Sequence, residues 1–117
     1  MGPTPRFIEL DEASAFARVR ESPGAVLMYI TSAGCADCEE LARALEALVH
    51  RYPGPLICGH LDRRKAPAFA KEYGVLQVPT LLLVHRGRVL SRLVGPTCVD
   101  PLLPALQSLI ERSAAAA

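Results

Sequence analysis

Tryptophan is absent from the sequence, and aromatic residues of all kinds make up only 5% of it. The charge is also nearly balanced, with 13 basic and 12 acidic residues and a formal net charge of +1. Proteins that bind nucleic acids rely on a basic surface and on aromatic rings that stack with bases. The sequence offers little of either, so we expect no nucleic-acid partner.

Long hydrophobic runs are absent too. The longest runs, Ala25 to Ile30 and Leu81 to Val84, fall far short of the roughly 20 residues that cross a bilayer. The start of the chain contains prolines and an acid where a secretion signal would need an unbroken apolar stretch. We therefore expect a soluble, cytoplasmic protein with no membrane partner.

The residues that are present suffice for one ordinary domain. The chain has 117 residues, of which half are hydrophobic and 21% are charged, as is typical of globular proteins and not of disordered ones. Because domains average about 150 residues, residues 1–117 are predicted to form a single domain. Residues 1–5 and 113–117 are expected to be loose tails.

Alternating strand and helix patterns predict an α/β fold, with a central mixed sheet flanked by helices on both faces. Ala25 to Thr31 is almost continuously apolar, as in a parallel strand that is covered on both sides. The leucines that recur from Leu41 to Leu48 mark one face of a helix. The predicted strands are 6–9, 25–31, 56–61, 80–84 and 88–94, and the predicted helices are 11–22, 36–50, 66–73 and 100–110.

The most specific motif is Cys35-Ala-Asp-Cys38, which lies between the most apolar predicted strand and the helix that follows it. The N–H groups and the positive dipole end of a helix start favour a thiolate, the nucleophilic form of cysteine. The spacing puts Cys38 one helical turn further on, where it can resolve a mixed disulfide formed at Cys35. In a reducing compartment, cysteines favour redox chemistry or metal binding over structural crosslinks. We therefore expect Cys35 and Cys38 to be catalytic.

Two stretches of the sequence resemble the thioredoxin family. The first is the strand and redox motif from Val26 to Cys38, and the second is Tyr-Gly-Val-Leu-Gln-Val-Pro-Thr from Tyr73 to Thr80. Asp62 between them also fits the pattern, and the likeness extends from about Arg6 to Arg112. The resemblance implies a thioredoxin fold and a thiol–disulfide oxidoreductase that reduces protein disulfides.

The resemblance further implies a substrate site and partners. The Val78–Pro79 bond would be cis and would lie beside the two sulfurs, where the backbone of Val78 can pair with an extended substrate. Gly34, directly before the first cysteine, would belong to the same site. The substrates would be disulfide-containing proteins, and a reductase or a small thiol would donate the electrons. The reaction requires no metal and no tightly bound cofactor.

Departures from the family's pattern change the surroundings of the two cysteines. Gly34 and Thr31 stand where the family has tryptophan, which reduces the apolar surface available for docking. Tyr29 replaces a buried acid that helps to take the proton from the second cysteine, and Cys58 replaces a lysine often found under the site. We therefore expect Tyr29 and Cys58 to modulate the chemistry and Cys38 to resolve slowly.

Asp37 lies inside the motif, where the family commonly has a Gly-Pro pair. In one interpretation, the acid at this position does no more than stabilise the helix N-terminus, as Glu39 and Glu40 do. The same three charges oppose a thiolate on Cys35 and therefore predict a better reductant.

The sequence leaves two other interpretations open. Cys35, Cys38, Cys58 and His60 have the residue types of a Cys3His zinc site, although Cys58 and His60 would face the same way along one strand. Alternatively, the chain is a non-catalytic thioredoxin-like partner or chaperone, whose cysteines are structural or regulatory.

Overall fold

A mixed five-stranded sheet is the central layer of the computed structural model, which describes residues 7–22, 24–33, 35–51, 56–95 and 104. The strands of this part of the chain lie in the order β1-β3-β2-β4-β5. β1 and β3 run parallel to β2, β4 runs antiparallel to β2, and β5 runs antiparallel to β4. The strands are β1 (Phe7–Leu10), β2 (Ala25–Thr31), β3 (Leu56–Asp62), β4 (Thr80–His85) and β5 (Arg88–Val94).

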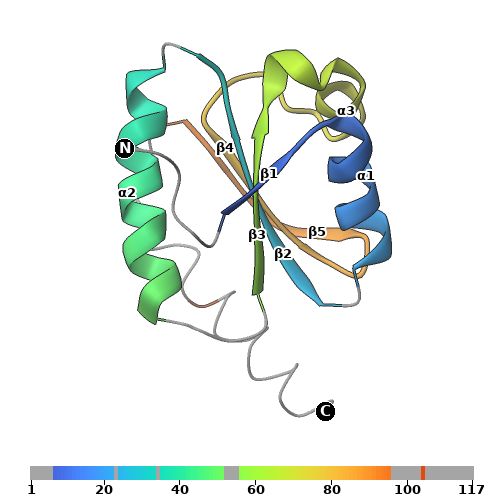
Figure 1. Cartoon of the computed structure of the whole chain (residues 1–117), viewed down its shortest axis with the longest axis horizontal. Helices are drawn as coiled ribbons and strands as arrows, with labels where there is room; N and C mark the ends of the chain where they lie inside the picture. Colours follow the sequence, from blue (N-terminus) through green and yellow to red (C-terminus); the bar gives the residue numbers. More distant parts are fainter. Residues whose placement is uncertain (1–6, 23, 34, 52–55, 96–103, 105–117) are drawn as a thin grey trace.

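Helices cover both faces of this sheet (Figure 1). α2 (Ala36–Arg51) lies along one face, whereas α1 (Glu12–Glu21) and α3 (Pro67–Glu72) lie on the other. A short 3-10 helix, η1 (Arg63–Lys65), precedes α3. The predicted α/β architecture, with helices on both sides of a mixed sheet, is confirmed.

The two faces of β2 belong to two separate halves of the core. Successive side chains of a strand point to opposite faces. Leu27 and Tyr29 accordingly pack with residues of α2, whereas Val26, Met28 and Ile30 pack with residues of α1 and α3. All of β2 is buried, as its continuous apolar run predicts. The strand that leads into the cysteine motif is thus held from both sides.

Hydrogen bonds to side chains fix where the helices begin. Asp11 accepts a hydrogen bond from the N–H of Ser14 at 2.8 Å and donates its own N–H to the Ser14 hydroxyl at 2.9 Å, which forms a capping box before α1. α3 has no such cap of its own. Instead, the carboxylate of Glu12 accepts from the N–H groups of Ala68 and Phe69, at 2.6 and 3.1 Å. Glu12 therefore ties α1 to the start of α3.

The predicted boundaries differ from the structure by one or two residues in most elements. Strand β1 ends one residue later than predicted, at Leu10, and β4 continues to His85, which pairs with Ala25. The predicted helix 66–73 is one residue shorter at each end, because Ala66 is the residue that caps the start of α3 and Tyr73 is the residue that caps its end. η1 precedes α3 and is capped by Asp62, whose side chain accepts from the N–H of Arg64. The predicted tails 1–5 and 113–117, and the predicted helix 100–110 apart from Pro104, lie outside the described residues.

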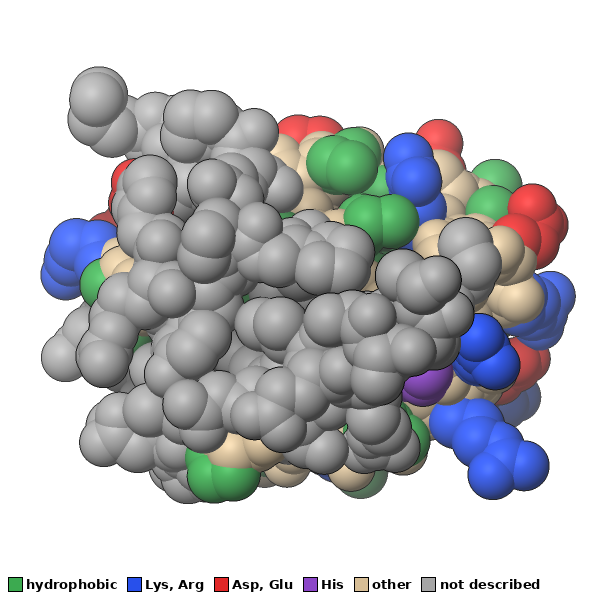
Figure 2. Space-filling model, turned by 90° about the horizontal axis from the view of Figure 1, so that it is seen from below, with side chains coloured by type: hydrophobic (Ala, Val, Ile, Leu, Met, Phe, Trp, Pro, Cys, Tyr) green, Lys and Arg blue, Asp and Glu red, His purple; other side chains and the backbone are tan. Residues whose placement is uncertain are grey.

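The described surface carries side chains of both charges. In Figure 2, Lys and Arg side chains lie beside Asp and Glu side chains along the rim of one face. The large hydrophobic residues exposed in the described part of the chain include Leu76, which is 85% exposed. No helix among the described residues is long and apolar enough to cross a membrane.

Candidate functional site

The fold brings the two motifs of the sequence to one end of the sheet. Cys35 directly precedes α2, and Cys38 lies in the first turn of that helix. β2 and β4 are antiparallel, and Ile30 near the end of β2 pairs with Thr80 at the start of β4. Pro79, the residue before Thr80, therefore lies at the end of the sheet where β2 leads into the cysteine motif.

The two cysteines differ in exposure and in backbone contacts. They are joined as a disulfide, with 5.3 Å between their Cα atoms. The Cys35 sulfur is partly exposed and accepts a hydrogen bond from the N–H of Cys38 at 3.1 Å, whereas Cys38 is only 4% exposed. An N–H group in the first turn of a helix stabilises negative charge on the atom it contacts. In the reduced protein, Cys35 is therefore the accessible sulfur whose anion the helix supports.

Tyr29 and Cys58 lie in the same buried cluster as Cys38, under the motif. The hydroxyl of Tyr29 donates to the carbonyl oxygen of Cys38. Burial, with a smaller contribution from the charge of Glu39, raises the pKa of Tyr29 to about 12. Tyr29 therefore keeps its proton at neutral pH and cannot accept one from a thiol.

The Val78–Pro79 peptide bond is cis, as the family resemblance implies. Val78 is half-buried and packs against the cluster that Cys35 also contacts. The carbonyl oxygen of the buried Pro79 accepts the N–H of Gly95 at 2.9 Å. Val78, the residue before the cis bond, and Cys35 thus pack against the same buried cluster.

Comparison with known proteins identifies the group to which this site belongs. The family model described as thioredoxin matches residues 6–108. The chain belongs to the thioredoxin family. It has the thioredoxin fold, and it is a thiol–disulfide oxidoreductase of the protein-disulfide reductase type.

Relatives within the family differ in how much of their length this chain covers. A thioredoxin of Chlorobaculum thiosulfatiphilum is 28% identical over 90 residues, which are 77% of this chain and 83% of the relative. A bifunctional thioredoxin reductase/thioredoxin of Mycobacterium leprae (strain TN) is 31% identical over 103 residues, which are 88% of this chain but only 22% of that protein. The structure of a mutant thioredoxin from Halobacterium salinarum NRC-1 matches with a TM-score of 0.77 and 23% identity, over 94% of this chain and 96% of that one.

Arginine side chains hold the segment that precedes the cis bond of this thioredoxin-family protein. Nε of Arg63 donates to the carbonyl oxygen of Val75 at 2.8 Å. The guanidinium of Arg92 donates to the carbonyl oxygens of Tyr73 and Gly74, at 2.5 and 3.3 Å. These contacts could not be predicted from the sequence, because Arg92 comes from β5 and Arg63 from η1.

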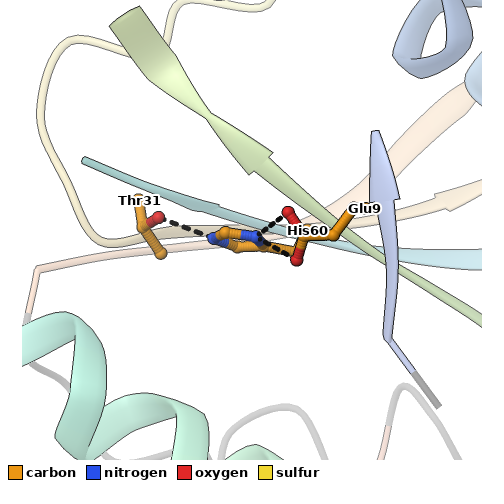
Figure 3. Close-up of polar contacts among 3 residues, drawn as sticks. All are labelled: Glu9, Thr31 and His60. Carbon is orange, nitrogen blue, oxygen red and sulfur yellow. Dashed lines mark hydrogen bonds and ion pairs between the residues drawn. The ribbon is translucent and has the colours of Figure 1, made fainter. Parts of the chain in front are cut away.

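Hydrogen bonds link three polar side chains at the same end of the sheet, and these contacts were not predicted from the sequence (Figure 3). Nδ1 of His60 lies 2.8 and 2.9 Å from the two carboxylate oxygens of Glu9, and Nε2 lies 2.7 Å from the hydroxyl of Thr31. Thr31 is one of the positions where the family has tryptophan. Both ring nitrogens of His60 are therefore engaged by side chains other than cysteines.

The zinc interpretation finds no support in this arrangement. Cys58 and His60 lie on the same face of β3, as their spacing predicts. His60, however, contacts Glu9 and Thr31, and the described residues contain no cluster of three or more His, Cys, Asp or Glu side chains able to hold a metal.

The remaining predicted site residues are only partly described. Gly34 lies outside the described residues. Asp37 lies in the first turn of α2, between the two cysteines.

Proposed function

We propose that Cys35 is the attacking thiolate of this oxidoreductase and that Cys38 is the resolving thiol. The observation that carries the proposal is the hydrogen bond from the N–H of Cys38 to the Cys35 sulfur at the start of a 16-residue helix. Cys35 attacks one sulfur of a substrate disulfide, and the other substrate sulfur leaves as a thiolate. Cys38 then attacks the Cys35 sulfur of the mixed disulfide and releases the second substrate thiol.

The substrate in this proposal lies along Val78, Pro79 and Gly34. The backbone of Val78 pairs with an extended segment of the substrate, and Gly34, directly before Cys35 in the sequence, belongs to the same substrate site. The position of Val78 against the cluster that Cys35 contacts supports this assignment. Tyr29, Asp37 and Cys58 modulate the reaction without touching the substrate.

We further propose protein disulfides as the substrates and a reductase as the electron donor. Members of the thioredoxin family reduce disulfides in proteins and are themselves reduced by thioredoxin reductase. The Mycobacterium leprae relative, whose name joins both activities in one protein, supports a reductase as the donor for this chain. A small thiol is the alternative donor, and the cytoplasm is the compartment that supplies both.

The reduction potential of the Cys35–Cys38 pair tests the direction of this reaction. We expect a value near the −270 mV of thioredoxin, because the charges of Asp37, Glu39 and Glu40 weaken the stabilisation of the Cys35 thiolate. The potential is measured by equilibration in dithiothreitol buffers, followed by alkylation and mass spectrometry. A value above about −200 mV would contradict a reductant role, because the cytosolic poise would leave such a dithiol little driving force.

Replacing Asp37 with alanine is the matched control for this measurement. Without the carboxylate, the thiolate is better stabilised and the potential rises. An unchanged potential would show that Asp37 serves only the N-terminus of α2.

A further inference from the structure

The resolving step releases a proton for which the site described above has no acceptor. Cys38 must lose its thiol proton before it can attack the mixed disulfide. Tyr29, which occupies the position of the family's buried acid, is itself protonated at neutral pH and already donates to the Cys38 carbonyl. The proton therefore has to leave through another group.

His60 has the chemistry and the position for this task. It lies on the face of the sheet that carries Tyr29, and the centroids of the two rings are 5.4 Å apart. Histidine is the side chain that normally changes charge between about pH 5 and pH 8. Its side chain is 24% exposed, so the ring can exchange protons with solvent after each turnover.

The contacts of His60 define which nitrogen is free to accept a proton (Figure 3). The carboxylate of Glu9 can only accept, so Nδ1 donates to it. In the neutral ring, Nε2 then carries the lone pair and accepts from the hydroxyl of Thr31. Thr31 is the last residue of β2, the strand that the cysteine motif follows in the sequence, and its hydroxyl lies on the opposite side of the imidazole from Glu9 (Figure 3).

We propose that His60 is the proton acceptor of the redox site, with Glu9 and Thr31 positioning its ring. This inference rests on the proposed roles of Cys35 and Cys38. The Cys38 thiol loses its proton to Nε2 of His60, through the Thr31 hydroxyl, and its sulfur bonds to Cys35. The bond between Cys35 and the substrate sulfur breaks, and its electron pair leaves with the substrate as a thiolate. The dithiol has then been oxidised, the substrate disulfide has been reduced, and the imidazolium returns its proton to the solvent or to the substrate thiolate.

Other titratable groups surround His60 and have to be separated from it by experiment. Glu39 is the strongest competitor, because its charge acts on Tyr29 from α2. Among the described residues, titratable groups on the neighbouring elements include Glu9 of β1, Tyr29 of β2, Cys58 of β3, and Cys38 and Glu39 of α2.

The experiment is a single turnover of the reduced protein with an aromatic disulfide whose thiolate product absorbs visible light. The first thiolate released reports attack by Cys35, and the second reports resolution by Cys38. The chain has a further cysteine, Cys98, which lies outside the described residues. It is replaced by serine in every variant, so that its thiol does not contribute to the signal. Both phases are measured from pH 5 to pH 9 for the reference protein and for His60→Asn, Thr31→Val, Glu39→Gln and His85→Asn.

In the reference protein, we expect the second phase to accelerate as the pH rises through the range in which histidine loses its charge. In His60→Asn, the second phase is expected to be at least about tenfold slower at pH 7. In this variant, the pH range over which the rate of the second phase rises should move to that of an ordinary thiol, near pH 8.5. Thr31→Val, which keeps the shape of the side chain, should slow the same phase. The first phase should keep its rate in both variants, which shows that the fold is intact.

His85→Asn is the matched control, because His85 pairs with Ala25 at the opposite end of β2 from Thr31. This variant should behave like the reference protein. An unchanged pH profile in His60→Asn, or loss of the inflection in Glu39→Gln instead, would overturn the proposal. Absence of the first phase from the reference protein would instead refute the proposed role of Cys35.

Discussion

Replacing Cys35 with serine is expected to abolish catalysis of disulfide reduction, so that the rate of insulin reduction by dithiothreitol falls to the rate with dithiothreitol alone. The reason is that the Cys35 sulfur is the partly exposed one and accepts the N–H of Cys38. A serine hydroxyl at the same position is not ionised at neutral pH and cannot form a mixed disulfide. The assay follows the turbidity of the precipitated insulin chains.

A Cys98→Ser variant is the control for this loss, because it removes a thiol that has no proposed part in the reaction. It should reduce insulin as fast as the unsubstituted protein. If the unsubstituted protein is no faster than Cys35→Ser, the non-catalytic interpretation of the chain is correct.

The largest effect on stability is expected from Phe69→Ala, with a loss of about 3–5 kcal/mol in the free energy of unfolding. Phe69 is fully buried, and its ring packs against those of Tyr73 and Phe16, with centroid distances of 4.6 and 5.1 Å. Truncation leaves a cavity between α1, α3 and the sheet. Since small domains are stable by about 5–15 kcal/mol, this is a large share of the total. Urea denaturation followed by circular dichroism measures the loss.

Leu76→Ala provides the comparison, because Leu76 is a residue of similar hydrophobicity that is 85% exposed. Its replacement should change the free energy of unfolding by less than about 0.5 kcal/mol. Equal losses in the two variants would mean that Phe69 is not a core residue.

The strands and helices near the core could be predicted because their signals are local. The continuous apolar run of β2 and the Asp11 cap of α1 each predict an element within a few residues of itself. The start of the helix 66–73 was predicted less accurately, because a separate 3-10 turn, capped by Asp62, comes directly before it and periodicity does not reveal that turn. Local patterns define elements well and their junctions less well.

The redox motif could also be predicted from the sequence, whereas its supporting contacts could not. Cys35 and Cys38 are close in sequence, and their position at the start of a helix predicts their chemistry. The contact of Glu9 with His60 joins residues 51 positions apart and exists only because β1 and β3 are neighbours in the sheet. The link from Arg92 to Gly74 likewise depends on the packing of β5 against a distant loop.

The most direct test of the roles of the two cysteines is the trapping of a mixed disulfide. In a Cys38→Ser variant with Cys98 also replaced by serine, the substrate remains attached after the first attack, because no thiol resolves the intermediate. The adduct is isolated by non-reducing electrophoresis and its attachment site is mapped by mass spectrometry. We expect the substrate to be bound to Cys35, and no adduct in the corresponding Cys35→Ser variant. A stable adduct on Cys38 in the Cys35→Ser variant, with none in Cys38→Ser, would reverse the two roles and contradict this account.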